Sequence, residues 1–155
     1  MMAPHASLFF KVPNGLATRH VLLEGHKRVF GISLLAPDYW QKFVKAPFHI
    51  YYRRWEYFRA LFNEFGFVDL RMLNENTDPS LEATRRHIKG DIKKIKLHLK
   101  AENFANPDQF RTLRVACRYF FDEVTQDLET MAWDDLFFKY RVTFWEGIAN
   151  APLRN

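Results

Sequence analysis

The chain of 155 residues contains a single cysteine, Cys117. One thiol excludes an internal disulfide and a metal centre built from several cysteines. Because Cys117 falls on the apolar face of a predicted helix, we interpret it as a buried structural thiol and not as a nucleophile.

Long hydrophobic runs are absent too. The uncharged stretch at residues 29–37 is far shorter than the roughly 18–20 apolar residues that cross a bilayer. We therefore expect no membrane-spanning segment, and we expect any association with a membrane to be peripheral.

Motifs for catalysis or cofactor binding are missing as well. The histidines do not form the i, i+4 pair of a zinc protease, and no serine lies in a nucleophile-elbow context. The glycines are too scattered for a phosphate-binding loop. We therefore predict an accessory protein with no active site, metal or cofactor of its own. The residues considered are His5, His20, His26, His49, His87, His98, Ser7, Ser33, Ser80, Gly15, Gly25, Gly31, Gly66 and Gly90.

Aromatic residues, in contrast, are abundant, with 16 Phe, 6 Tyr and 4 Trp. A domain of this size buries only about 70% of the surface of its unfolded chain, and each ring carries roughly 150–250 Å². Because aromatic residues are enriched at the centres of interfaces, we expect some of these rings to contact a partner. A self-contained, Phe-rich core is the alternative.

Length and composition indicate one folded domain. Hydrophobic residues make up 48% and charged residues 26%, and the formal net charge is +5. This excess of positive charge points to an acidic partner surface, nucleic acid or a matrix-like compartment. Residues 1–37 contain several basic residues but only one acid, Glu24. We divide the chain into this basic N-terminal arm, which is either a targeting feature or packs on a partner, and a helical domain over residues 38–155.

Apolar residues recur with helical spacing over residues 51–65, and Gly66 follows in the position of a left-handed C-cap. Asp78 and Pro79 then provide an N-cap and a first-turn proline for a helix that continues to about Lys100. We expect one face of the first helix to be buried against the other helices. That face consists of Tyr51, Trp55, Phe58 and Phe62.

Asn106 and Pro107 again provide an N-cap and a first-turn proline, and a longer apolar stripe follows them. The longest helix should therefore begin there and extend beyond Val124. A last helical stripe connects Trp133 with Ile148. No convincing alternating strand is present. We therefore predict an all-α fold of four or five helices with an extended N-terminal arm.

A strongly basic run lies in the second of these helices. Four surroundings suit such a run: a phosphate backbone, an anionic lipid surface, an acidic protein or solvent. Nucleic acid is the least favoured, because the run contains no aromatic residue that could stack on bases. An acidic block over residues 122–135 could neutralise the run if the two helices pack antiparallel. The basic residues are Arg85, Arg86, Lys89, Lys93, Lys94, Lys96 and Lys100.

We predict that the partner interface combines aromatic residues near position 40 with part of the basic run. The candidate interface residues are Trp40, Phe43, Phe48, Arg85, Arg86, Lys93 and Lys94. Acidic subunits of a membrane complex, and anionic lipid headgroups, are the partners that such a surface would suit.

Four short elements occur in the same order as in a known family. An aromatic helix enters a corner at residues 61–69, an Ala-x-Arg-Arg element follows at residues 83–86, and Phe110 begins an aromatic-Arg-x-x-Arg element. Leu128 then precedes Trp133 by five residues, with Asp134, Asp135 and Tyr140 after it. In this order and spacing the chain resembles the ubiquinol–cytochrome c reductase binding protein family, a small helical subunit of respiratory complex III.

The chain departs from the family at four places. His87-Ile88 and Glu129 replace parts of two Leu-Pro elements, residues 90–105 resemble an insertion, and the N-terminal arm is longer. The resemblance implies a non-catalytic subunit that is peripheral on the matrix side of the mitochondrial inner membrane, bridges cytochrome b and the core subunits and supports assembly. The family is linked to quinone, but no quinone ligand carries over to a residue of this chain.

Other classes of function stay open. The basic run suits a subunit of a mitochondrial ribosome or of another organellar complex, and an accessory subunit of a different respiratory complex fits the same composition. A small α-helical enzyme or a carrier-binding adaptor of the Leu-Tyr-Arg type is a further alternative, and residues 49–54 match that tripeptide in part. Salt-dependent binding of RNA by the isolated chain would favour the ribosomal role.

Overall fold

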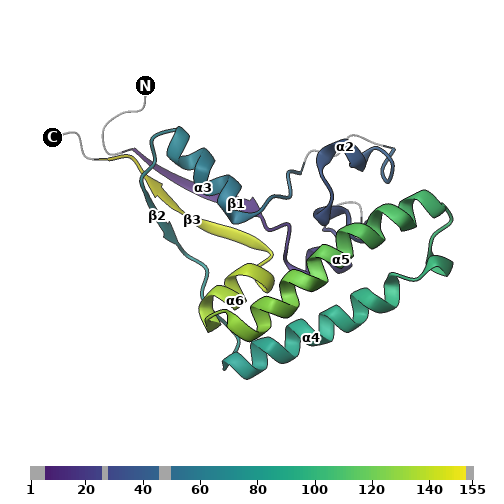
Figure 1. Cartoon of the computed structure of the whole chain (residues 1–155). Coiled ribbons are helices and arrows are strands. Elements are labelled where there is room, and N and C mark those ends of the chain that lie inside the picture. Colours follow the sequence, from purple (N-terminus) through teal and green to yellow (C-terminus); the bar gives the residue numbers. More distant parts are fainter. Residues whose placement is uncertain (1–5, 26–27, 46–49, 153–155) are drawn as a thin grey trace.

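The structure is a computed structural model that describes residues 6–25, 28–45 and 50–152 (Figure 1). A small antiparallel sheet lies at one end, and a pair of long helices forms the other. The elements are β1 (Ser7–Pro13), α1 (Thr18–Leu22), the 3-10 helix η1 (Ile32–Leu34), α2 (Pro37–Trp40), α3 (Trp55–Glu64), β2 (Asp69–Met72), α4 (Leu81–His98), the 3-10 helix η2 (Ala101–Asn103), α5 (Pro107–Thr130), α6 (Trp133–Tyr140) and β3 (Phe144–Asn150).

The prediction of an all-α fold is wrong, because the last apolar stripe divides between α6 and the strand β3. Helix α6 ends at Tyr140, and β3 becomes the central strand of a sheet with the order β1-β3-β2. Along β3 the residues alternate between buried and half-buried, and Trp145, Gly147 and Ala149 face the core. Phe144 and Ile148, which the helical pattern had included, lie on the other side of the strand.

The N-terminal segment is part of this sheet and not an extended arm. Strand β1 pairs with β3 from Ser7↔Asn150 to Pro13↔Phe144. The next residue, Asn14, is fully buried, and its side-chain amide donates hydrogen bonds to the carbonyl oxygens of Lys139 (2.9 Å) and Val142 (2.7 Å). These bonds satisfy carbonyl groups at the end of α6 and tie the start of the chain to the turn before β3.

Helices α4 and α5 form an antiparallel hairpin (Figure 1). The predicted position of the longest helix is confirmed, since α5 begins at Pro107 and the Asn106 side chain accepts a hydrogen bond from the backbone N–H of Asp108. The start of α4 lies slightly later than expected, because Ser80 and not Asp78 caps it. Ile88 and Ile95 of α4 pack with residues of α5 in the largest core cluster. Those α5 residues are Cys117, Phe120 and Val124.

Helix α3 covers the inner face of the sheet (Figure 1). Phe58 and Phe62 are buried as expected, and Trp55 is half-buried. The expectation for Tyr51 is wrong: the helix starts four residues later, at Trp55, so Tyr51 lies outside it and its side chain is 60% exposed.

The aromatic residues mostly form the domain's own core. Phe10, Phe58, Phe62, Phe67, Phe137 and Trp145 share one cluster, which Trp55 and Phe138 border. Several rings nevertheless lie on the surface, and their contact with a partner stays a prediction. The exposed rings are Phe9, Tyr39, Tyr51, Tyr57, Phe65 and Tyr119.

Candidate functional site

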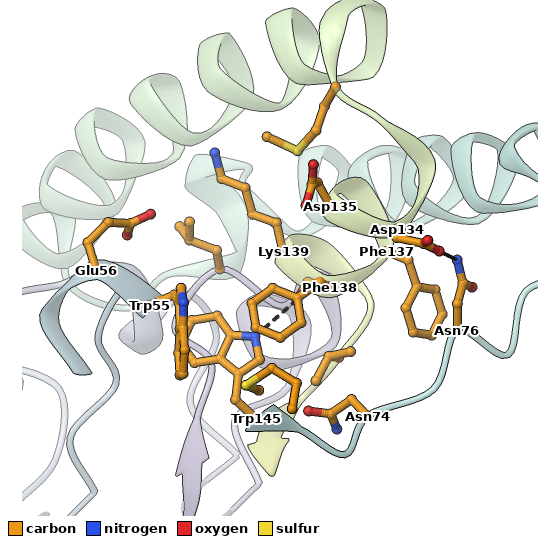
Figure 2. Close-up of a pocket in the computed structure, with 14 residues that line it drawn as sticks. Trp55, Glu56, Asn74, Asn76, Asp134, Asp135, Phe137, Phe138, Lys139 and Trp145 are labelled. Atoms are coloured by element: carbon orange, nitrogen blue, oxygen red, sulfur yellow. Dashed lines mark hydrogen bonds between the residues drawn. The ribbon is translucent and has the colours of Figure 1, made fainter. Parts of the chain in front are cut away.

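The structure has two surfaces at which a partner or ligand could bind. The first is a cavity of about 650 Å³ between α3, the segment after β2, α6 and β3 (Figure 2). Its size is typical of sites for small ligands or for a side chain of a partner. We call it the aromatic cavity. Its lining residues are Leu16, Trp55, Glu56, Met72, Asn74, Asn76, Met131, Asp134, Asp135, Phe137, Phe138, Lys139, Val142 and Trp145.

Three rings from three elements meet in the wall of the aromatic cavity. Trp55 packs edge-on against Phe138, with 5.6 Å between the ring centroids, and against Trp145 at 5.4 Å. The rings of Phe138 and Trp145 stack at 5.5 Å. The indole N–H of Trp145 donates to the carbonyl oxygen of Phe138, as a buried indole requires. This bond holds the two stacked rings in place.

Polar groups around the aromatic cavity come from the segment after β2 and from the first turn of α6. The side-chain amide of Asn74 binds the backbone of β3 twice: its oxygen accepts from the N–H of Glu146 (2.9 Å), and its NH₂ group donates to the carbonyl oxygen of Phe144 (3.1 Å). The side-chain amide of Asn76 donates to Asp134 at 3.0 Å (Figure 2). Asp134 and Asp135 belong to the first turn of α6, where the helix dipole favours negative charge.

Among the described residues that line the aromatic cavity there is no Ser, Thr, Cys, His or Tyr, and its ionisable groups are the carboxylates of Glu56, Asp134 and Asp135 and the ammonium group of Lys139. The described part of the chain also holds no group of three or more His, Cys, Asp or Glu side chains arranged for a metal ion.

The second surface is a positively charged groove between α4 and α5. It consists of two adjoining hollows of about 530 and 660 Å³ that share Lys96 and Phe121. We call it the basic groove. Its cationic residues are Lys89, Lys93, Lys96, Arg111, Arg114 and Arg118, its apolar residues are Ile92, Leu97, Leu99, Val115, Phe121, Val124 and Leu128, and Asp122 and Thr125 complete the lining.

The acidic block does not neutralise the lysines of α4. Glu123 forms ion pairs with Arg54 (2.6 Å) and Lys139 (2.7 Å), and Asp127 binds Lys139 at 2.6 Å. In an antiparallel hairpin, residues equally far from the turn lie opposite each other. The C-terminal half of α4 therefore faces the N-terminal half of α5, and Lys96 of α4 lines the same hollow as Arg111, Arg114 and Arg118 of α5.

Most cations of the basic groove have no acidic partner. Within the described residues, no Asp or Glu lies within 4 Å of the side-chain nitrogens of Lys89, Lys93, Lys96, Arg114 or Arg118. The ammonium group of Lys96 lies over the ring of the half-buried Phe121, 5.1 Å from its centroid. The groove thus has an apolar floor and an excess of positive charge on both sides, although Arg111 is paired with Asp108 and Asp122 also lines it.

The ion pairs and hydrogen bonds of Glu123 and Asp127 shift the pKa values of neighbouring groups. Burial opposes ionisation of Glu123, but hydrogen bonds from Arg54 and Lys139 outweigh it and lower its pKa. Burial and the hydrogen bond to Asp127 raise the pKa of Tyr140, whose hydroxyl donates to that carboxylate at 2.6 Å. This network joins α3, α5 and α6, and its acids are not available to the basic groove.

The predicted interface residues lie in different environments. Trp40 is only 5% exposed, and its indole N–H donates to Leu35 O, so little of the ring is left for a partner. Phe43 is half-buried, and Phe48 lies outside the described residues. Lys93 lines the basic groove.

The remaining three predicted basic residues do not line the groove. Arg85 is half-buried, Arg86 is exposed, and Lys94 lies near Asp91 at 3.6 Å. Sequence reasoning missed the α5 side of the groove, where Phe121, Arg114 and Arg118 lie. Their helical spacing was visible, but the face of α5 that turns toward α4 was not.

Within the described residues, no helix is both long and apolar enough to cross a membrane. Comparisons with known protein families, with curated proteins and with solved structures find no match to this chain.

Proposed function

We propose that this protein is a structural subunit of a larger assembly and that the basic groove docks on an acidic partner. The observation that carries the proposal is the excess of cations, most of them without an acidic partner, on both sides of an apolar floor. A groove of this kind suits an amphipathic helix, whose apolar residues occupy the floor while its acidic residues meet the lysines and arginines. Complementary charge would set the orientation and the rate of association.

The groove favours an acidic protein over single-stranded nucleic acid. Binding of single strands combines cationic side chains with aromatic rings on which bases stack. Phe121 is the aromatic residue that lines the groove, but it is half-buried and the ammonium group of Lys96 covers its ring. Tyr119 is 71% exposed, but it does not line the groove.

The first assembly to test is complex III, with the protein peripheral on the matrix side of the mitochondrial inner membrane. The resemblance to its binding-protein family motivates this choice, while the mixed fold differs from the all-helical fold that the resemblance implies. Our proposal therefore depends on the groove, and cytochrome b, the core subunits or anionic headgroups are the surfaces it would meet.

The test is incorporation of charge-reversed protein into the native assembly. A tagged chain carrying Lys93→Glu and Lys96→Glu would be expressed in its own cells and followed by native electrophoresis of solubilised membranes. Loss of two rim ion pairs should weaken docking about tenfold or more. The matched control is Arg59→Glu with Arg71→Glu, two exposed cations outside the groove.

Two outcomes would contradict the proposal. Equal incorporation of the groove variant and the control would show that the groove is not the docking surface. Salt-dependent binding of poly(U) RNA by the isolated wild-type chain, lost in the groove variant, would instead assign the groove to RNA. Circular dichroism of each variant checks that the fold is retained.

A further inference from the structure

The aromatic cavity lies apart from the basic groove and has the opposite charge. We propose that it binds an arginine or lysine side chain carried by an extended segment of a partner protein. The inference is independent of the proposed docking surface, because the cavity and the groove share no lining residue.

The rings of the cavity suit a cation on an apolar stem. Tryptophan is the strongest partner for a cation placed over a ring face, and Trp55 is half-buried at the wall of the cavity (Figure 2). Because Trp145 and Phe138 stack behind it at 5.5 Å, the position of the Trp55 ring is constrained. The methylene groups of a lysine or arginine would lie against the apolar walls, as they do on other apolar surfaces.

The charge around the cavity selects for the same ligand. Glu56 and Asp135 have no Lys or Arg nitrogen within 4 Å among the described residues, and Asp134 is bound by the neutral amide of Asn76. Lys139 also lines the cavity, but its ammonium group is bound to Glu123 (2.7 Å) and Asp127 (2.6 Å). The cavity therefore presents three carboxylates with no cation free to neutralise them.

The path into the cavity favours a peptide over a free cation. Strand β2 is an edge strand that pairs only with β3 in the described part of the chain. Its last residue, Met72, lines the cavity, as does Asn74. An extended segment added to this edge could form main-chain hydrogen bonds with β2 while one of its side chains enters the cavity.

The experiment compares three probes on the full chain. The first is a blocked pentapeptide, Thr-Val-Arg-Val-Thr, the second has the neutral isostere citrulline in place of arginine, and the third is agmatine, an alkylguanidinium without a peptide backbone. Binding is followed by the shift of the Trp55 indole N–H resonance, assigned with Trp55→Phe. The resonance of Trp40, which lies in another core cluster, should not move and serves as an internal control.

We expect the arginine peptide to bind about fivefold more tightly than the citrulline peptide, because one partly exposed ion pair contributes a difference in affinity of that size. Glu56→Gln with Asp135→Asn should remove this difference. The matched double variant Glu64→Gln with Glu129→Gln, which removes two exposed acids outside the cavity, should preserve it.

Three results would overturn the inference. Equal binding of the arginine and citrulline peptides would show that charge is not recognised. Agmatine binding as tightly as the arginine peptide would show that the backbone contributes nothing and that the ligand is a free cation. No shift of the Trp55 resonance at millimolar peptide would show that the cavity does not bind this class of ligand.

Discussion

Gly147 is the residue at which the sheet can be tested most sharply. It lies in the central strand β3, opposite Phe10 of β1 and Met72 of β2. A Cβ atom at this position would lie 2.5 Å from Cζ of Phe10 and 2.6 Å from the backbone oxygen of Arg71. Phe10 is 5% exposed and packs against Phe62 at 4.7 Å, so its ring cannot turn away freely. The carbonyl group is held in the strand β2.

The cost of Gly147→Ala follows from these contacts. Overpacking of a core typically costs about 1–3 kcal/mol, and a clash with backbone lies toward the upper end. The lower entropy of the unfolded alanine chain offsets about 0.4–1 kcal/mol. We therefore expect a net loss of about 2 kcal/mol, which corresponds to a fall in Tm of about 4–8 °C for a chain of this length.

Gly90→Ala is the matched control. Gly90 lies in α4, and a Cβ atom there would meet nothing within 4 Å. Alanine should stabilise the helix by roughly 0.5–1 kcal/mol. Both variants are measured by thermal and urea unfolding followed by circular dichroism, and the two changes should have opposite signs. Stabilisation by Gly147→Ala would refute the sheet and indicate that residues 144–150 are helical, as their sequence pattern predicts.

Two further predictions concern titratable groups. Burial raises the pKa of the Cys117 thiol to about 12, so iodoacetamide at pH 8 should alkylate it only after unfolding in urea; rapid labelling of the native protein would contradict its burial. The pKa of Glu123 is lowered by Arg54 and Lys139 against the effect of burial. Its stabilisation should therefore be complete above the unfolded pKa of about 4.3 and be lost as the pH falls through the lower folded pKa. Unfolding free energies of wild type and Glu123→Gln should converge in acid, and a constant difference would exclude this linkage.

Local signals in the sequence determined much of the helical part. Asn106 and Pro107 marked the start of α5 because an N-cap acts on residues only two or three positions away, and here the Asn106 side chain binds the N–H of Asp108. The burial of Phe58 and Phe62 followed from their i, i+4 spacing on one helix face.

The sheet could not be determined in this way. Ser7 and Asn150, whose side chains hydrogen-bond at 2.7 Å, are separated by 143 positions, and no local pattern links them. In β3 the inward positions include Gly147 and Ala149, whose small side chains make the alternation of a strand hard to recognise. Phe144 and Ile148 meanwhile keep the spacing of a helix.

Both candidate surfaces also depend on tertiary structure. The lysines of α4 were evident as a run, but only the antiparallel hairpin places Lys96 in the same hollow as Arg114 and Arg118 of α5. The aromatic cavity combines Trp55 of α3 and Trp145 of β3, which are far apart in the sequence but have ring centroids 5.4 Å apart in the fold. Capping and helical periodicity involve neighbours within a few residues, so the sequence can reveal them. Which faces of the helices and the sheet pack together depends on contacts between segments that are far apart in the sequence. Those contacts form when the apolar surfaces are buried together, so only the tertiary structure shows them.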